Sequence, residues 1–202
     1  MISGVKAERI VRGLSPLVLA CVLCASWSSP GRAAADISDV MGELSRVIVA
    51  EGRFTERKYL SILSEPLVLE GTVRYRAPDY VRKEYDDPDS ESYEVRGDDL
   101  IIELPDGRRR DLTIDEHPVL RAFVESYRGT LAGDLETLSR YFDLALSGSM
   151  DDWQLILKPR LPELAEFLDA VVVNGRGGRV YRMETLESSG DRSVMTIDDP
   201  GE

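Results

Sequence analysis

Residues 54–88 read FTERKYLSILSEPLVLEGTVRYRAPDYVRKEYDDP, and this stretch predicts the type of fold. It contains three segments rich in aromatic and aliphatic residues, separated by prolines: Phe54 to Leu63, Leu67 to Arg76 and Tyr80 to Tyr85. Aromatic and β-branched residues favour strands, whereas proline interrupts the hydrogen-bond ladder of a sheet. Three successive strands with short connections predict an antiparallel meander.

More strands are expected after this meander. Leu100 to Leu104 and Arg109 to Ile114 flank Pro105-Asp106-Gly107, a turn in which glycine adopts a positive φ at little cost, so they predict a hairpin. The rest of the chain is mostly strand-like: Asp143 to Ser147, Trp153 to Lys158, Ala170 to Asn174, Val180 to Leu186 and Ser193 to Ile197.

Helical periodicity appears in two places. Near the start, apolar residues recur at three- and four-residue spacing: Ile37, Val40, Met41, Leu44, Val47 and Ile48. They predict a helix that begins after Asp36 and ends at Gly52. In mid-chain, Pro118 begins a helix that ends at Gly129, and Asp134 caps a second one. We therefore expect one α+β domain, a single antiparallel sheet with helices on one face.

The first 35 residues predict a cleaved signal peptide. A basic region, an apolar run and a small-residue cleavage site follow in the order that export requires: Lys6, Arg9 and Arg12, then Leu14 to Ala25, then Ala33-Ala34-Ala35. The apolar run is too short to remain as a membrane-spanning helix. We expect residues 1–35 to be removed and residues 36–202 to form the mature domain in the periplasm.

An alternative concerns the cysteines. Val18-Leu19-Ala20-Cys21 loosely resembles a lipobox, and acylation of Cys21 would make the protein an acceptor anchored in the outer membrane. In the cleaved form both cysteines, Cys21 and Cys24, are lost with the signal peptide. The mature domain then has no disulfide, so its stability depends on one packed core.

The charge of the chain argues against nucleic acids and anionic lipid surfaces as partners. It has 25 Lys and Arg against 37 Asp and Glu, a net charge of −12. Nucleic acids and anionic lipid surfaces repel such a protein, because binding to them is driven by basic side chains that displace counterions.

Catalytic and metal-binding motifs are not expected either. His117 stands at the start of a predicted helix, where a capping or surface role fits better than catalysis, and no serine lies in a Gly-x-Ser-x-Gly motif. The acidic run of residues 86–91 lacks the spacing and glycine of a calcium-binding loop. We expect neither an enzyme, nor a bound metal, nor a cofactor.

The order of the remaining motifs resembles the LolA-type periplasmic lipoprotein carriers. Those proteins have a helix, a strand that opens with Phe-x-Gln, and a long segment with fixed Gly, Pro and Arg positions. The corresponding residues here are Phe54-Thr55-Glu56, Gly71, Pro78, Arg82 and Pro88, followed by Gly97-Asp98-Asp99-Leu100, Trp153 to Pro159 and Gly190-Asp191-Arg192-Ser193. Three departures, Glu56 for Gln, Val81 for Phe and Lys83 for Trp, indicate a divergent branch.

The resemblance implies a strongly curved half-barrel whose apolar concave face, covered by helices, binds acyl chains. Alternation places three sets of residues on shared faces: Val81, Lys83 and Tyr85; Leu100, Ile102 and Leu104; Trp153, Leu155 and Leu157. The resemblance assigns them to the cavity. Ordinary core packing has the same apolar signature, so that alternative stays open.

The mid-chain helices have the same two interpretations, a movable lid or a fixed cover. Their apolar stripe contains the residues that the resemblance assigns to a lid: Leu120, Phe123, Val124, Tyr127, Leu131 and Leu135. Gly129 and Gly133 lie between the helices and would serve as the hinge.

Two basic residues carry further hypotheses. Arg76 corresponds to the arginine that latches the lid in the family, or it is a solvated charge on a strand. Lys83 shares an apolar face with Val81 and Tyr85, where an ammonium needs a counter-charge. A protein carboxylate would make Lys83 structural, and an anionic group on the cargo would make it selective. We expect its stem to pack and its head to reach solvent at the rim.

Together these patterns predict a non-enzymatic, monomeric carrier that moves acylated lipoproteins towards the outer membrane. The resemblance implies an inner-membrane extraction machinery and an outer-membrane acceptor as partners. An alternative is a binding module for export of another amphipath, such as a glycolipid or polyketide-like lipid. The sequence does not identify the cargo.

Overall fold

The computed structural model describes residues 34–88 and 90–198. The predicted signal peptide lies outside these residues except for Ala34 and Ala35, and so does Cys21.

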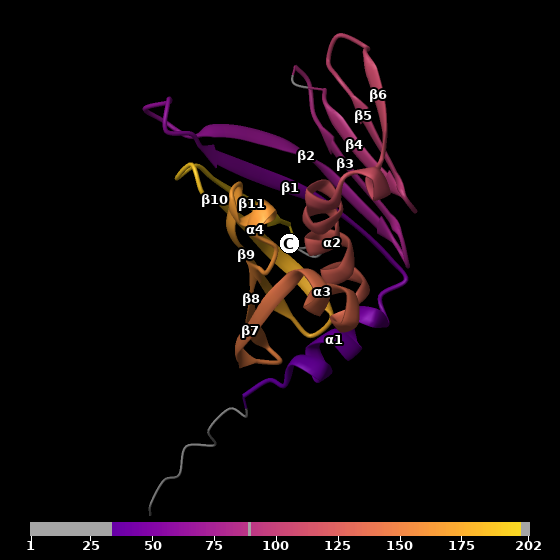
Figure 1. The fold of residues 1–202 in the computed structure, drawn as a ribbon, viewed down its shortest axis with the longest axis vertical. Helices are drawn as coiled ribbons and strands as arrows, with labels where there is room; N and C mark the ends of the chain where they lie inside the picture. Colours follow the sequence, from indigo (N-terminus) through magenta and orange to yellow (C-terminus); the bar gives the residue numbers. More distant parts are fainter. Residues whose placement is uncertain (1–33, 89, 199–202) are drawn as a thin grey trace, which may run out of the picture. The chain divides into compact units, whose positions relative to one another are not determined.

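Within the described residues, the fold is one antiparallel sheet of eleven strands (Figure 1). The strands are β1 Val49–Tyr59, β2 Leu67–Arg76, β3 Tyr80–Tyr85, β4 Ser92–Arg96, β5 Asp99–Glu103, β6 Arg109–Thr113, β7 Phe142–Ser149, β8 Asp152–Pro159, β9 Leu168–Arg176, β10 Arg179–Glu187 and β11 Arg192–Ile197. Their order in space is β6-β5-β4-β3-β2-β1-β11-β10-β9-β8-β7. Two meanders are thus joined where β1 pairs with β11, and the sheet is not closed into a barrel.

The helices lie mainly between β6 and β7 in the sequence. They are α1 Ile37–Ser45, α2 Pro118–Ala132, α3 Leu135–Tyr141 and α4 Pro162–Ala165, with a 3-10 turn at Ile114–Glu116. The two halves of the sheet curve around α2 and α3, which cover the concave face (Figure 1). The predicted α+β class, with a curved sheet and helices on one face, is confirmed.

Both ends of α2 follow from local chemistry. Pro118 stands in its first turn, where the missing N–H of proline is not needed. Gly133 ends the helix with a φ of 65°. A Cβ on Gly133 would lie 2.2 Å from the carbonyl oxygen of Met41 in α1, so glycine also allows the close approach of α1.

Two predicted helix ends are wrong. The mid-chain helix α2 continues past Gly129 to Ala132, so Gly129 lies inside it and not between the helices. The first helix ends at Ser45 and not at Gly52, because the β-branched residues after it begin β1 at Val49. Gly52 lies inside β1, where a Cβ would lie 2.8 Å from the side chain of Ile197 on β11. The strand β4 has few apolar residues and was not predicted, and pairing with β3 and β5 on either side holds it in the sheet.

The core lies on the concave face and is divided in two. The larger cluster packs under the helices and includes Phe54, Leu138 and Trp153, each at most 1 % exposed. A smaller cluster of Val95, Leu100, Ile114 and Val124 joins β4, β5 and α2. The outer strands β3–β6 therefore rest on a separate and smaller core.

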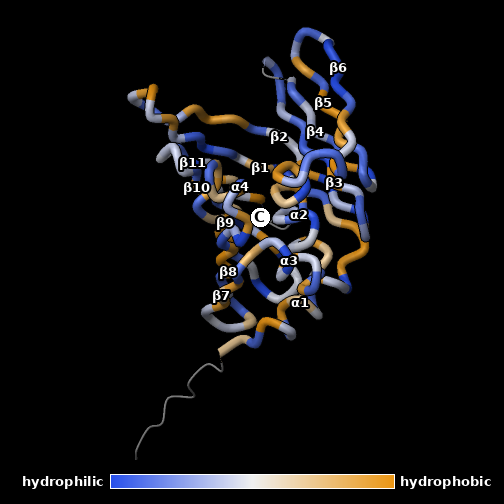
Figure 2. The backbone as a smooth tube through the Cα atoms, in the orientation of Figure 1, coloured by the Kyte–Doolittle hydropathy of each residue, from blue (hydrophilic) through white to orange (hydrophobic). Residues whose placement is uncertain are grey.

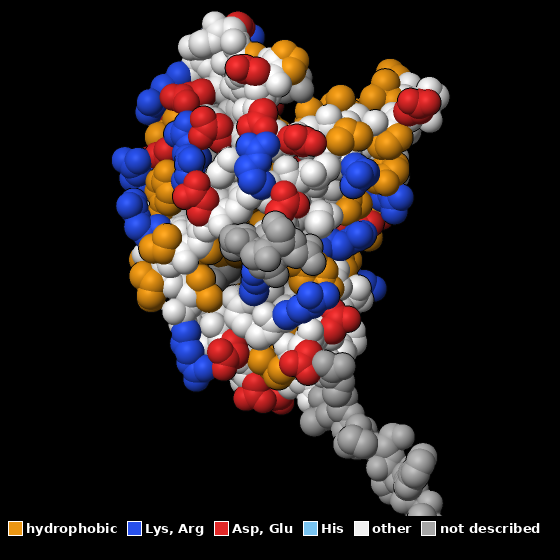
Figure 3. Space-filling view, turned by 180° about the vertical axis from the view of Figure 1, so that it is seen from behind, with side chains coloured by type: hydrophobic (Ala, Val, Ile, Leu, Met, Phe, Trp, Pro, Cys, Tyr) orange, Lys and Arg blue, Asp and Glu red, His pale blue; other side chains and the backbone are white. Residues whose placement is uncertain are grey.

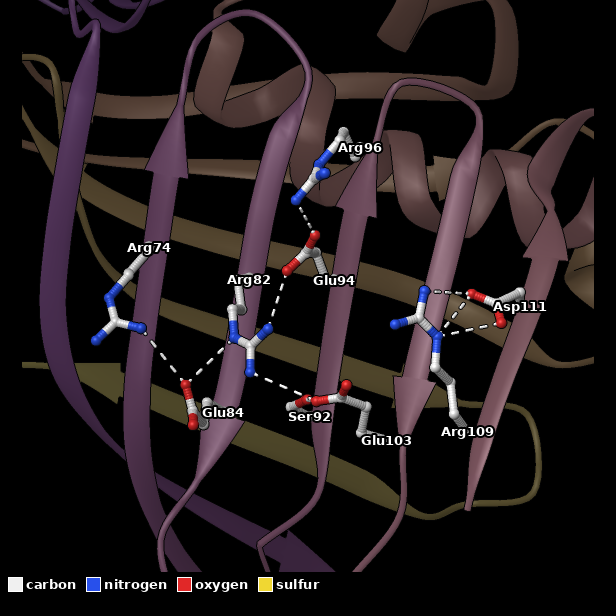
Figure 4. A network of polar contacts seen from close by, with 9 residues as sticks. All are labelled: Arg74, Arg82, Glu84, Ser92, Glu94, Arg96, Glu103, Arg109 and Asp111. Carbon is white, nitrogen blue, oxygen red and sulfur yellow. Dashed lines mark hydrogen bonds and ion pairs between the residues drawn. The ribbon is translucent and has the colours of Figure 1, made fainter. Parts of the chain in front are cut away.

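The opposite, convex face carries mixed charges (Figure 3). Ion pairs run from strand to strand across β2–β5 (Figure 4), as between Arg82 and Glu94 at 2.9 Å or Arg74 and Glu84 at 3.4 Å, whereas Arg109 pairs with Asp111 within β6. The exposed Arg74–Glu84 pair contributes little, about 0–1 kcal/mol, whereas the Glu94 side chain is only 9 % exposed. The alternating signs of these charges leave this face without a large patch of one charge.

The β1–β2 hairpin ends in apolar residues that the helices do not cover (Figure 2). Ile62 is 87 % exposed and Leu63 is 48 % exposed. The backbone N–H of Ser61 donates to Asp191 in the β10–β11 turn at 2.7 Å, so the tip is tied to the neighbouring turn.

Candidate functional site

A largely apolar cavity among the described residues has a volume of about 400 Å³. Its walls come from β1, β2, β3, β10 and β11 of the concave face and from α1 and α2. Small-molecule sites typically occupy roughly 300–1,000 Å³ and are lined mainly by apolar side chains. The dimensions and the lining therefore suit a slender apolar ligand.

Four of the residues that the sequence analysis assigned to the site line this cavity. Val81 and Lys83 face it from β3, and Tyr127 and Leu131 face it from α2. Tyr85 is on the same face of β3, where it is buried with its ring 5.5 Å from that of Phe54. The predicted face of β3 is therefore the one that borders the cavity.

The other predicted cavity residues are on the concave face but away from this cavity. Leu100 and Ile102 belong to the small cluster on β5, and Leu104 is half-buried just after that strand. The remaining three are at most 1 % exposed in the main core: Trp153, Leu155 and Leu157. Their contact with an acyl chain stays a prediction.

The predicted lid stripe divides along α2. Leu120 and Val124 pack on the small cluster of the outer strands, whereas Tyr127 and Leu131 cover the cavity. Phe123 is 37 % exposed, with its ring 5.4 Å from that of Tyr127. Leu135, on α3, is partly buried against the main core.

Polar contacts that the sequence analysis missed fasten α2 to both halves of the sheet. The hydroxyls of Tyr127 and Thr185 on β10 lie 2.8 Å apart. Arg128 donates to the carbonyl oxygen of Gly97 in the β4–β5 turn, and Arg121 lies 2.7 Å from Asp98. No sequence motif identifies these pairs, because they depend on where the helix crosses the sheet.

Arg76, the predicted latch, is exposed at the end of β2. Its guanidinium lies 4.8 Å from the centre of the Tyr80 ring. By alternation it is on the face opposite to Tyr75, which lines the cavity. The latch role of Arg76 stays a prediction.

A buried polar cluster forms part of the cavity wall. Lys83 Nζ lies 2.8 Å from Glu56 Oε2, and the hydroxyls of Tyr85 and Ser193 also donate to this carboxylate. The ammonium stands 5.0 Å from the ring centre of Phe54 and 4.8 Å from that of Tyr85. The two departures noted at positions 56 and 83 are thus partners in one ion pair.

This pair corrects one expectation and bears on two alternatives. The head of Lys83 does not reach solvent at the rim, since it bonds to Glu56 and only 20 % of the side chain is exposed. Glu56 supplies the protein counter-charge that the structural alternative for Lys83 requires, and selection of an anionic cargo by Lys83 stays a prediction. The paired charges leave this part of the cavity wall without net charge.

The protonation of the cluster follows from its contacts. Burial raises the pKa of Glu56, but the charge of Lys83 and the donors around the carboxylate outweigh burial, so the net pKa is lowered. Burial lowers the pKa of Lys83 although Glu56 opposes the change. Burial and the Glu56 charge raise the pKa of the Tyr85 phenol well above its ordinary value. Glu56 is therefore a carboxylate at neutral pH, and Tyr85 remains a donor.

Residues 34–88 and 90–198 show neither a metal centre nor a membrane-spanning helix. No group of three or more His, Cys, Asp and Glu side chains there could hold a metal ion. None of the helices in these two ranges is long and apolar enough to span a membrane.

This chain is similar to one known protein family and to several solved structures. The family model described as "Outer membrane lipoprotein carrier protein LolA-like" matches residues 29–197. The chain is similar to a LolA superfamily protein from Nitrosomonas europaea, with 12% identity, 82% of this chain and 93% of that chain covered, and a TM-score of 0.40. It is also similar to the Pseudomonas aeruginosa MucA/MucB complex, with 16% identity, 81% and 56% covered, and a TM-score of 0.43. The curated proteins gave no match by sequence.

Proposed function

This chain belongs to the LolA-like outer membrane lipoprotein carrier family, and we propose that it is a non-enzymatic carrier that holds an acyl chain in the cavity beneath α2. The cavity carries the proposal, because its lining is largely apolar and it lies between the concave face and the helices that cover it. The cargo is a lipoprotein or a related lipid.

The free energy of such binding suits a carrier. Burial of an acyl chain contributes roughly 0.8 kcal/mol per methylene group, so several buried methylenes give an affinity that is useful and still reversible. The Glu56–Lys83 pair supports an uncharged occupant, because Glu56 already satisfies the ammonium. An anionic group placed deep in the cavity would compete with Glu56 and gain little.

We place the carrier in the periplasm, between an inner-membrane extraction machinery and an outer-membrane acceptor, as expected for the family. This placement rests on the predicted removal of residues 1–35. The intact mass of the exported protein tests it, since a chain that begins near Asp36 supports a soluble carrier. A diacylglyceryl group on Cys21 would instead support the anchored acceptor.

A fluorescent fatty acyl probe tests the cavity. Val73 and Val68 are on opposite faces of β2, and Val73 lines the cavity whereas Val68 is 50 % exposed on the convex face. We expect Val73→Asp to reduce probe affinity at least ten-fold, because it places a charge in a largely apolar wall, beside a Lys83 that already pairs with Glu56. Val68→Asp, the matched control, should bind as the wild type does.

Leu131→Asp repeats the test from the helix side of the cavity. Circular dichroism establishes that each variant is folded. Unchanged affinity in folded Val73→Asp and Leu131→Asp variants would place the acyl site elsewhere.

A further inference from the structure

Tyr75 lines the cavity from β2, where it stands opposite Ala50 on β1 and Val81 on β3. Its side chain is almost fully buried, with an exposed fraction of 3 %. Unlike the apolar side chains that line the cavity around it, it carries a hydroxyl group.

That hydroxyl is buried and has no hydrogen-bond partner among the described residues. Two other phenols near the cavity are paired, since Tyr127 bonds to Thr185 and Tyr85 donates to Glu56. A buried polar group without a partner costs free energy that a suitable ligand atom can recover. Such groups are few in native proteins, and a water molecule, an ion or a ligand can supply the missing partner.

Tyr75 is near the open end of the cavity. Its neighbours on β1, Val49 and Ala50, are exposed, and Val49 is 67 % exposed. Further along the concave face the lining residues Met183 and Met195 are buried, at 3 % and 5 %. A ligand whose apolar chain reaches the two methionines would place the atoms next to its polar end beside Tyr75.

The charges around Tyr75 favour a neutral acceptor. Burial, and then the negative charge of Asp79, raise the pKa of Tyr75, so the phenol stays protonated and can donate. The same negative charge repels an anionic group at this position. Lys83 is paired with Glu56, and Arg179 donates to the carbonyl oxygen of Asp198, so both cations already have partners.

We propose that the Tyr75 hydroxyl donates a hydrogen bond to the carbonyl oxygen of a neutral acyl linkage, an ester, thioester or amide. The proposal rests on the acyl-carrier function and adds its ligand class. The site would prefer chains linked through a carbonyl over alkyl ethers, whose oxygen is a weaker acceptor, and over free fatty acids, whose carboxylate is charged.

Two lysophosphatidylcholines test this directly, one with a hexadecanoyl ester and one with a hexadecyl ether. Wild-type protein should bind the ester roughly three- to ten-fold more tightly, the usual effect of one hydrogen bond. Tyr75→Phe should remove the preference by weakening the ester and leaving the ether unchanged. Palmitate should bind less tightly than the ester.

A comparison with a peptide N-acylated with the same chain distinguishes the two sources of such a carbonyl. Stronger binding of the acyl peptide indicates lipoprotein cargo, and stronger binding of the ester indicates a glycerolipid. The wild type should prefer both the acyl peptide and the ester over the ether. Loss of either preference in Tyr75→Phe supports the role of the hydroxyl.

Tyr127→Phe is the matched control. It removes a hydroxyl from another residue that lines the cavity, and this hydroxyl already has a hydrogen-bond partner. It should destabilise the fold and affect ester and ether alike, whereas Tyr75→Phe should leave stability unchanged or raised. Destabilisation by Tyr75→Phe, or equal binding of ester and ether by the wild type, would overturn the proposal. If the wild type binds no acyl ligand at all, the carrier function itself fails.

Discussion

At the scale of single residues, Glu56 and Lys83 show how this chain tolerates charge in an apolar cavity. They come from β1 and β3, with β2 between them, and their side chains meet on the concave face. Either charge alone would be costly there, and together they satisfy each other. The pair takes positions at which the family has Gln and Trp, so one change makes the other acceptable.

Glu56→Gln should therefore destabilise the protein. The ammonium of Lys83 would lose its counter-charge, and we expect the free energy of unfolding to fall by about 2–3 kcal/mol, below the roughly 3–5 kcal/mol of a fully buried pair because Lys83 is partly exposed. Adding Lys83→Met should recover most of the loss. Urea unfolding measures both variants.

Asp86→Asn is the control for this experiment, since it breaks the exposed ion pair with Arg53 and should change the free energy of unfolding much less than Glu56→Gln does. A double variant no more stable than Glu56→Gln alone would show that the two charges are not coupled.

The same pair predicts a dependence of stability on pH. Glu56 has a lowered pKa in the folded protein, so it binds a proton less readily folded than unfolded. Its contribution is present above the unfolded value of 4.5 and is lost as the pH falls through the lower folded pKa.

Unfolding free energies measured from pH 6 down to pH 3 test this dependence. The decline should be shallower in the Glu56→Gln/Lys83→Met double variant, in which other carboxylates still titrate. Equal slopes in the two proteins would assign the acid sensitivity to those other groups.

The sequence could predict only one partner of the Glu56–Lys83 pair. Alternation placed Lys83 on an apolar face and so required a counter-charge. It did not identify Glu56, which lies 27 positions away and reaches Lys83 only through the register of three strands. Tyr75 was missed for a similar reason, because the burial of its hydroxyl depends on how the strands and helices meet.

At the scale of elements, α2 decides which part of the concave face is core and which is cavity. Its first half packs on the outer strands, and its second half covers the hollow beside β1–β3. The apolar stripe predicted the helix but not this division, since the crossing of helix and sheet is set by tertiary packing. For the same reason, the sequence pattern could not distinguish Val81, which borders the cavity, from Trp153, which belongs to the core.

Arg128→Ala tests whether the contacts of α2 keep the cavity covered. It removes the hydrogen bond to Gly97 and the partly buried pair with Glu125, whose side chain is 8 % exposed. We expect faster amide exchange across residues 118–132, because the closed position of α2 loses about 1–2 kcal/mol of stabilisation. An acyl probe should therefore be released roughly five- to thirty-fold faster.

Arg140→Ala is the matched control on α3, where the pair with Glu136 is exposed and lies within one helix. It should change neither exchange in α2 nor probe release. If Arg128→Ala behaves like this control, the cover of α2 does not depend on Arg128.

At the scale of the whole molecule, the fold is one sheet in which the first and last strands pair. Local patterns predicted the meander of β1–β3, the β5–β6 hairpin, the later strands and the α+β class, because each of these is encoded by neighbouring residues. The β1–β11 junction joins residues such as Phe54 and Ile197, and no local pattern marks it. That junction brings β10 and β11 to the cavity, so the sequence predicted one side of the site better than the other.

The most direct test of the carrier proposal is native mass spectrometry of the protein purified from its own cell envelope. The account predicts a species heavier than the protein alone by the mass of a carbonyl-linked acyl lipid or lipoprotein, recovered on extraction and absent from Val73→Asp. Ligand-free protein from cells, together with failure to take up added acyl lipids, would contradict it.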